Sequence, residues 1–184
     1  LVSSQTIKIS SLINQSDNVW ANSKAEEEHG FVQHGFYDLI LQQQNSSELV
    51  IDSEDLSEDF EQLLLTSPAR ANSLRAFDWP PQGRVLEIGC GAGLVTSFLI
   101  QKNLHVDAIE TNRSLAQLAA IRARASDNCR IISEPFSKLD FESDRYDFIS
   151  TDVSELYIQM GDDNDVSITQ SVEAALNNFK ALLN

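Results

Sequence analysis

The sequence predicts a doubly wound α/β domain, and three observations support this prediction. Downstream of Pro80 and Pro81, apolar runs of strand length alternate with helical patterns. One of these runs, Arg84–Ile88, leads into a turn with three glycines at alternate positions. Such alternation is typical of right-handed βαβ units whose parallel sheet is covered on both faces. The chain has 184 residues, 42% of them hydrophobic, which suffices for one domain with a core.

Residues 67–184 are expected to form this α/β domain. The expected strands are short and apolar, and they span Arg84–Ile88, Val106–Glu110, Arg130–Ser133 and Tyr146–Thr151. A helix follows the glycine turn, with its apolar face at Leu94, Val95, Phe98 and Leu99. Asn112 is expected to cap the next helix, which runs to about Ala125. A last helix carries the apolar stripe Val172, Ala175, Leu176, Phe179, Leu182 and Leu183.

Residues 1–66 are expected to form a helical extension or lid, with Thr6–Ile9 as a short strand. One amphipathic helix is expected after Ser23, and a second near Ser53, where acidic residues favour a helix start. A third helix opens the α/β domain, with Ser67 as N-cap and Pro68 as its first residue. The side chains that this helix is predicted to bury are Ala71, Leu74 and Phe77.

The chain is strongly acidic, with a formal net charge of −15 and a pI near 4.4. Broad binding to nucleic-acid phosphates needs clustered lysine and arginine, so this charge argues against it. No apolar run approaches the length of a membrane span, and no signal peptide is recognisable. Cys90 and Cys129 lie in different predicted elements, so we expect reduced thiols and a cytoplasmic location.

The glycine turn restricts the class of ligand. Its glycines are Gly89, Gly91 and Gly93, whereas the dinucleotide fingerprint needs a glycine where Leu94 stands. The Gly-Lys-Ser/Thr of a P-loop is not present either. Glu87, two residues before the first glycine, would oppose a pyrophosphate and suits a cationic ligand. A nicotinamide oxidoreductase is therefore disfavoured.

A second acid closes the next predicted strand. Glu110 ends the run His105–Glu110, about one βαβ step after the glycines. An acid at that place accepts hydrogen bonds from both hydroxyls of a ribose. Together with Glu87 it predicts an adenosine-like ligand that carries a positive centre and no phosphates.

Three stretches, Val85–Gly93, Val106–Glu110 and Tyr146–Asp152, resemble the class I S-adenosylmethionine-dependent methyltransferases. The resemblance covers roughly residues 67 to 183 and implies a Rossmann-like, mostly parallel sheet with S-adenosyl-L-methionine as cofactor. It implies that the methionine part is lined by Glu87, Gly89, Cys90, Gly91 and Gly93. It also places Glu110 at the ribose, Thr111 or Asn112 beside the adenine, and Asp152 at the methyl end.

The chain departs from that family at two places. Where the family often has an acid for the adenine amino group, this chain reads Ser133-Glu134-Pro135-Phe136, so Glu134 or the backbone N–H of Phe136 takes that role. The family sheet continues through a Pro-Gly-Gly turn into three more strands, whereas this sequence stops at Asn184. We therefore expect a sheet truncated after the fourth strand and its following helix. An open edge on that strand favours a homodimer or fusion to another domain.

The segment Ser67–Arg75 is similar to one found in methyltransferases associated with bacterial surface-glycan synthesis. That similarity implies that Arg70 and Asn72 lie near the entrance of the site. The alternative is that both residues merely finish and solvate a helix. The similarity also favours a small-molecule or glycan acceptor.

Methyl transfer to a hydroxyl needs orientation, a pocket that tolerates a cation, and a base. The candidate bases are Asp152 and, in the N-terminal region, His34 or His29. No metal cluster stands out, since the acidic run at 162–165 lacks EF-hand spacing. The leading hypothesis is O-methylation of a small-molecule or carbohydrate acceptor. The alternative is a truncated or non-catalytic domain that acts as a cofactor-binding or interaction module of a larger protein.

Overall fold

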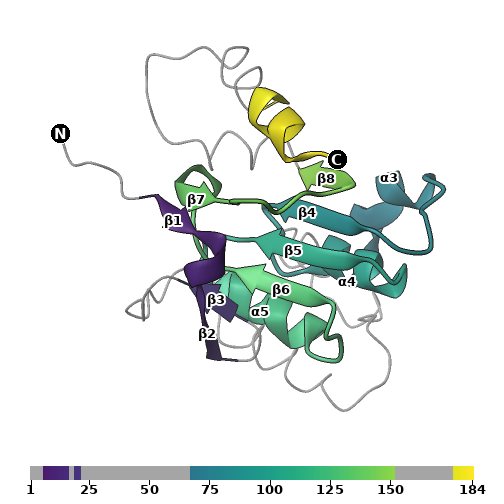
Figure 1. Ribbon diagram of the computed structural model, residues 1–184. Coiled ribbons are helices and arrows are strands. Elements are labelled where there is room, and N and C mark those ends of the chain that lie inside the picture. The colour runs from purple at the N-terminus through teal and green to yellow at the C-terminus, as the bar shows by residue number, and fades with distance from the viewer. Residues whose placement is uncertain (1–5, 17–18, 22–66, 152–175) are drawn as a thin grey trace, which may run out of the picture.

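The computed structural model describes residues 6–16, 19–21, 67–151 and 176–184, and a six-stranded sheet forms its centre (Figure 1). The strand order is β2-β3-β6-β5-β4-β8. Four of these strands are mutually parallel: β4 (Arg84–Ile88), β5 (His105–Ile109), β6 (Cys129–Ile132) and β8 (Phe148–Thr151). They confirm the doubly wound prediction. Strand order reverses at β4, so ligands are expected at its carboxyl end.

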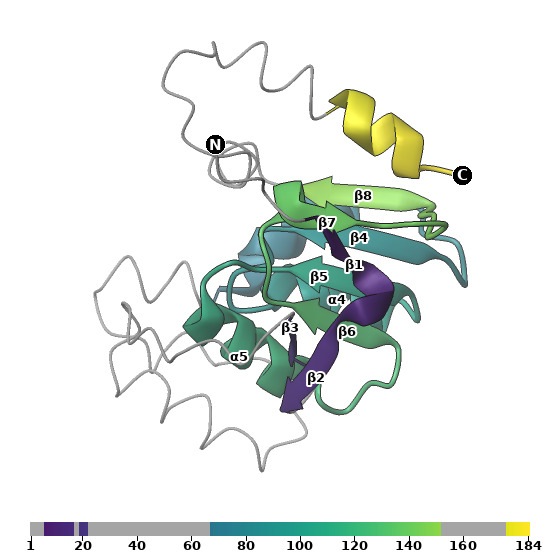
Figure 2. The same ribbon diagram turned by 60° about the vertical axis from the view of Figure 1, so that its left-hand side comes forward.

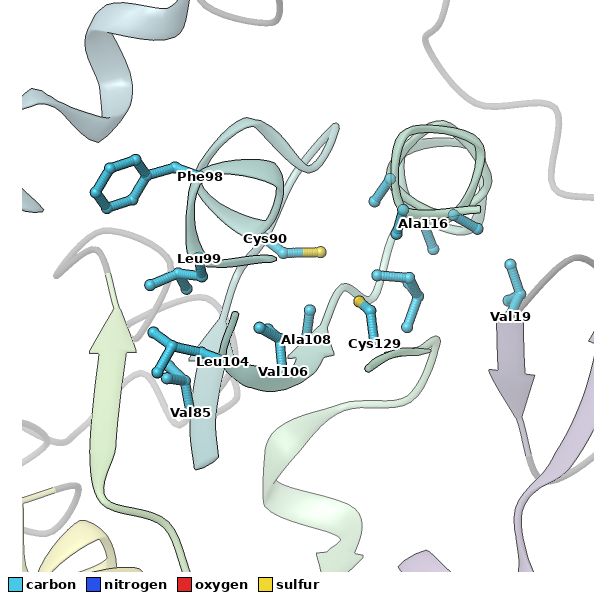
Figure 3. Close-up of a cluster of buried hydrophobic side chains, with 14 of the residues drawn as sticks. Val19, Val85, Cys90, Phe98, Leu99, Leu104, Val106, Ala108, Ala116 and Cys129 are labelled. Atoms are coloured by element: carbon cyan, nitrogen blue, oxygen red, sulfur yellow. The ribbon is translucent and has the colours of Figure 1, made fainter. Parts of the chain in front are cut away.

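Helices α4 (Leu94–Gln101) and α5 (Arg113–Ala123) cover one face of the sheet. Figure 3 shows strand side chains such as Val85 and Val106 between the sheet and these helices. The Asn112 cap is confirmed, because its Oδ1 accepts from the backbone N–H groups of Ser114 (3.0 Å) and Leu115 (3.2 Å). The buried side chains of α5 are small, which lets the helix lie close to the strands: Ala116, Ala119, Ala120 and Ala123.

Shorter elements cover the opposite face: η5 (Phe136–Lys138), a small parallel sheet of β1 (Ile7–Lys8) and β7 (Leu139–Asp140), and a helix at residues 176–182. Figure 2 shows β1 beside β7 in front of the main sheet. Phe136 joins these elements, since its ring centroid lies 5.6 Å from Phe141 and 5.7 Å from Phe179. The last predicted stripe is thus right for Phe179. It is wrong for Leu176, which is 58% exposed, and for Leu183, which is 40% exposed, whereas Val172 and Ala175 lie outside the described residues.

Residues 6–16 and 19–21 contribute strands to the fold. The short strand predicted at Thr6–Ile9 is confirmed by β1. Strand β2 (Ile13–Ser16) pairs antiparallel with β3 (Val19–Ala21), and β3 runs parallel to β6 at the sheet edge. The expectation of a helical extension is therefore wrong for this part. The helices predicted after residue 23 and near residue 53 lie outside the described residues.

The helical start at Ser67 is confirmed in part. Ser67 Oγ accepts from the backbone N–H of Ala69 at 3.3 Å, and Pro68 opens the short helix η4 (Pro68–Ala71), continued by α3 (Asn72–Arg75). The prediction that Phe77 is buried is wrong, since its side chain is 62% exposed. The reason is that the helix ends before Phe77. Trp79 fills the space instead, with its ring 5.0 Å from that of Phe148.

The C-terminal residues lie beside the beginning of β8. Tyr146 and Leu183 form a parallel bridge. The Tyr146 N–H donates to the Leu182 carbonyl at 2.9 Å, and the Asn184 N–H donates to the Tyr146 carbonyl at 3.0 Å. Within the described part of the chain, β8 itself has β4 as its one strand partner, so the expected outer edge is covered only at its start.

A charge cluster lies at the amino ends of the strands, and we call it the Asp107 cluster: Arg84, Asp107, Arg130, Asp144 and Tyr146. Asp107 accepts from Nε and Nη2 of Arg130, both at 2.8 Å, and from the Tyr146 hydroxyl at 2.8 Å. Arg84 adds a longer contact of 3.4 Å and pairs with Asp144 at 3.2 Å. The carboxylates and guanidinium groups therefore satisfy one another within the fold.

Candidate functional site

The candidate site begins with the turn that follows β4, residues 89–93. The backbone N–H groups of Gly89 and Cys90 both donate to the Ile109 carbonyl, at 2.9 and 3.0 Å. The Gly93 N–H donates to the Cys90 carbonyl at 2.9 Å. These bonds tie the turn to the end of β5, so the ends of the two strands share one edge. A ligand there also faces the amino end of α4.

Glycine is required at the positions of this turn for different structural reasons. All three have positive φ, at 76° for Gly89, 54° for Gly91 and 82° for Gly93, a region that side chains disfavour. A Cβ on Gly93 would lie 2.7 Å from Ala119 Cα, so this glycine lets α5 approach. A Cβ on Gly91 would meet only an Arg70 Nη1 at 4.0 Å. Open space at Gly91 is what a ligand that approaches the backbone requires.

Glu110 lies at the end of β5 and is 3% exposed. Its Oε2 accepts from the Gly91 N–H at 2.8 Å, and its Oε1 accepts from the Asn112 N–H at 2.7 Å. The carboxylate is thus held between the glycine turn and the start of α5. The structure confirms that Glu110 and the turn, predicted separately, come together.

Glu87 points from β4 toward α4 and is also 3% exposed. Its Oε2 accepts from the Thr96 hydroxyl at 2.7 Å. Burial raises the pKa of Glu87 to about 8, the Thr96 hydrogen bond and Arg70 oppose that rise, and the charge of Glu110 adds to it. A buried carboxyl with a raised pKa beside a second acid favours a cationic ligand, as predicted from the sequence.

Arg70 is brought to the site, as one of the two sequence interpretations held. It lies in η4 with an exposed side chain, above Gly91, and its charge acts on Glu87. Asn72 follows the other interpretation, because its Oδ1 accepts from Arg75 Nε at 3.2 Å within the same helix. Arg70 is therefore an exposed positive group beside the glycine turn and the buried Glu87.

The remaining predicted contacts differ in how the structure places them. Cys90 is 6% exposed and packs in the core beneath the helices (Figure 3), where burial raises its pKa well above the usual thiol value. Both cysteines are free thiols. Phe136 buries its ring in the opposite core, so only its backbone is left for an adenine. Thr111, by contrast, is exposed directly after Glu110.

The predicted bases cannot be placed with these groups. Asp152 follows β8 directly, but it lies outside the described residues, as do His34 and His29. Among the described residues, no group of three His, Cys, Asp or Glu side chains is arranged to hold a metal ion. The described part of the chain thus brings Glu87, Glu110 and the glycine turn together, while the predicted bases lie outside it.

Two residues of the site were not expected from the sequence. Thr96 donates to Glu87 and is fully buried in α4. Arg122, near the end of α5, donates from Nη1 to the Ala92 carbonyl in the turn. Neither belongs to a local motif. The one sequence feature that could have indicated Thr96 and Arg122 is that each is a polar residue at a helical position expected to face inward.

The residues present fit S-adenosylmethionine, the cofactor implied by the resemblance. Gly91 offers open space, Glu110 offers a buried carboxylate for ribose hydroxyls, and Glu87 is a second buried carboxyl whose pKa is raised by burial. Two arginines contact this region, the exposed Arg70 beside Gly91 and Arg122 at the Ala92 carbonyl, while Glu87 and Glu110 are buried acids. The donor set is therefore that of a cationic adenosine ligand.

Comparisons with known proteins agree with this geometry. A family model described as "Methyltransferase domain" matches residues 85–178. Ribosomal RNA small subunit methyltransferase A of Mesomycoplasma hyopneumoniae (strain 232) is 37% identical over 59 residues, which are 32% of this chain and 22% of that protein. The chain therefore spans about a fifth of that curated relative.

Two solved structures of methyltransferases are similar to this chain over part of their length. The glycopeptide N-methyltransferase MtfA, complexed with sinefungin, has a TM-score of 0.47 and 17% identity, over 64% of this chain and 49% of that one. The CcbJ methyltransferase from Streptomyces caelestis has a TM-score of 0.45 and 22% identity, over 64% and 46%. This chain thus spans about half the length of each.

No helix in the described ranges has the length and apolar character needed to cross a membrane.

The family match spans slightly more than half of the chain and includes Val85–Ile88 of β4, the glycine turn and Glu110. The protein therefore belongs to the methyltransferase-domain family, with the Rossmann-like fold and the S-adenosylmethionine cofactor of the class I enzymes.

Proposed function

We propose that this protein transfers a methyl group from S-adenosylmethionine to a hydroxyl of a small-molecule or carbohydrate acceptor. The observation that carries the cofactor part is the carboxylate of Glu110, held between the N–H groups of Gly91 and Asn112 at the end of β5. The acceptor part rests on the similarity of Ser67–Arg75 to enzymes of surface-glycan synthesis. We also propose that residues 1–66 contribute to a lid over residues 67–184.

Each described residue has a role that follows from its place. Glu110 accepts from ribose hydroxyls while it keeps the glycine turn in place. Glu87, once deprotonated, lowers the free energy of a positive charge close to the turn. Arg70, exposed at the rim above Gly91, suits the cofactor's carboxylate. The cofactor, when bound, supplies an electrophilic methyl group, and Asp152 is our candidate for the base that accepts the acceptor's proton.

The first experiment is calorimetric titration of the purified chain with S-adenosylhomocysteine. We expect binding in the micromolar range, and NADH should not bind. Glu110→Ala should weaken binding about 100-fold, because a charged hydrogen-bond acceptor is lost from both the turn and the ribose. Asp127→Ala, an exposed acid elsewhere on the surface, is the matched control and should bind as the wild type does.

The acceptor is tested next, with radiolabelled methyl donor and separate pools of sugars, small amines and ribosomal RNA. Label on sugars supports the proposed acceptor class. Label on amines or RNA alone would replace that class and keep the cofactor assignment. If a folded wild-type chain fails to bind S-adenosylhomocysteine, the second candidate, an interaction module of a larger protein, takes precedence.

A further inference from the structure

The orientation of the glycine turn depends on contacts from outside the turn. The Ala92–Gly93 peptide is held at both ends, because Gly93 N–H donates to the Cys90 carbonyl at 2.9 Å and the Ala92 carbonyl accepts from Arg122. The Cys90–Gly91 peptide is held by Glu110, through the Gly91 N–H at 2.8 Å. A planar peptide fixed at one atom has its other polar atom fixed as well. The peptide between these two, Gly91–Ala92, is oriented by its neighbours and by the Cys90 thiol, which donates to the Gly91 carbonyl at 3.7 Å.

Helix α5 makes two contacts with this turn from one face. Ala119 and Arg122 are three residues apart and so neighbours on the helix surface. Ala119 lies so close to Gly93 that a Cβ added to Gly93 would be 2.7 Å from the Ala119 Cα. Arg122 reaches Ala92, which is 3% exposed, and a buried carbonyl without a donor would be costly. The helix thus holds the turn at Ala92 and Gly93.

Arg122 suits this contact chemically. Burial lowers its pKa to about 10, so the guanidinium remains charged at neutral pH. A charged donor makes a stronger hydrogen bond to a carbonyl than a neutral one does. The cofactor-binding role of the turn does not by itself require an arginine at this point of α5.

We propose that Arg122 is a positioning residue for cofactor binding, which holds the Ala92 carbonyl so that the backbone at Gly91 faces the ligand. The proposal rests on the proposed function, since the ligand is the cofactor of that site. Arg122 itself is assigned no contact with the cofactor. Its effect passes through the orientation of the turn.

The test compares Arg122→Met, which keeps the aliphatic stem and removes the donors, with Arg122→Lys, which keeps a charge and a donor. Arg124→Met, at the exposed end of the same helix, is the matched control. Each variant of the full chain is titrated with S-adenosylhomocysteine well below its Tm. Amide hydrogen exchange at Gly91, Ala92 and Gly93 is measured by NMR without ligand.

We expect Arg122→Met to weaken binding on the order of tenfold and to accelerate exchange in the turn, with β4 amides unchanged. Arg122→Lys should restore most of the affinity, and Arg124→Met should change neither readout. A lower Tm for Arg122→Met with unchanged affinity and unchanged turn exchange would show a merely structural role and overturn the proposal. If the wild type does not bind, the proposed function is wrong. In that case amide hydrogen exchange in the turn is the remaining test of whether Arg122 positions the turn. Unchanged exchange in Arg122→Met would then overturn the positioning role.

Discussion

Strand β5 carries one acid, Asp107, and is followed directly by another, Glu110, and the two acids have different surroundings. Near its amino end, Asp107 is contacted by two guanidinium groups and a phenol. At its carboxyl end, Glu110 is held by two backbone N–H groups, and the neighbouring Glu87 by a hydroxyl. The Asp107 cluster balances its charges within the fold. Beyond the carboxyl end of β5, Glu87 and Glu110 are both buried, and the exposed Arg70 is the cation whose charge acts on Glu87.

This difference separates a structural site from a binding site. Buried charges are stabilising only when they are paired and hydrogen-bonded, and the Asp107 cluster meets that condition by itself. Glu87 does not, which is why burial raises its pKa to about 8. A cationic ligand would complete the charge balance at that end. The comparison therefore predicts that substitutions at one end affect stability, and at the other end affinity.

The largest effect is expected from Asp107→Asn. The substitution leaves Arg130 and Arg84 facing a neutral amide in a site that is largely buried, so unfolding should become easier by about 3 kcal/mol. Urea denaturation followed by circular dichroism measures this. S-adenosylhomocysteine affinity of the folded variant should change less than about twofold. Unchanged stability would mean that the cluster is not structural.

A smaller effect, of about 2 kcal/mol, is expected from Gly93→Ala, because the new Cβ meets the backbone of Ala119 at a positive φ. Gly91→Ala shares the positive φ but has open space, so it should destabilise the fold less and weaken cofactor binding more. Thermal melts and calorimetry on both variants separate these effects. Equal loss of affinity in both would contradict the assignment of the open space to the ligand.

The pH dependence of Glu87 sharpens the comparison further. Its folded pKa of about 8 lies above the ordinary value of 4.5, so its contribution to stability is present below pH 4.5 and is lost as pH rises through 8. Cation binding has the opposite pH dependence, because a cation binds more tightly to the deprotonated Glu87 carboxylate than to the neutral acid. S-adenosylmethionine affinity should rise by up to about tenfold per pH unit from pH 6 to 8 and then level off.

Calorimetry at several pH values measures that slope, with Glu87→Gln as the control that should abolish it. S-adenosylhomocysteine, which has no sulfonium charge, should show a shallower slope. The same slope in Glu87→Gln as in the wild type would rule out Glu87 as its source.

The smallest effect is expected from Tyr146→Phe. The variant removes the hydroxyl that donates to Asp107 at 2.8 Å but leaves the arginines in place, so the loss should be about 1 kcal/mol. A double-mutant cycle with Asp107→Asn should show that the two effects are not additive. Additivity would mean that the hydroxyl contributes through packing alone.

Local patterns were sufficient to predict the four parallel strands and the residues that the structure brings together at Glu110 and the glycine turn. The apolar run of β4, the glycines and Glu110 lie within thirty residues, and each pattern specifies its own backbone. The Asn112 cap and the Ser67 cap are local for the same reason. Such features depend little on the rest of the chain, so they can be predicted from the sequence.

The features that were missed depend on contacts between distant elements. Thr96 and Arg122 read as ordinary helical positions until the helices are packed on the turn. Phe77 continues a helical spacing, but the helix ends at Arg75 and the ring is left outside. Pairing between β3 and β6 could not be predicted from a local pattern. Strand β3 has three residues, and its partners lie far away in the sequence.

That pairing has a consequence for the time course of folding. Val19 lies opposite Ile131, more than one hundred positions later in the chain. On a ribosome, the segment that becomes β3 emerges early and must wait until β6 has been synthesised before it finds its partner. Closing so long a loop is entropically unfavourable and slow. The first strands of this chain should therefore be among the last to dock, and until then the edge of β6 is exposed to other chains in the cell.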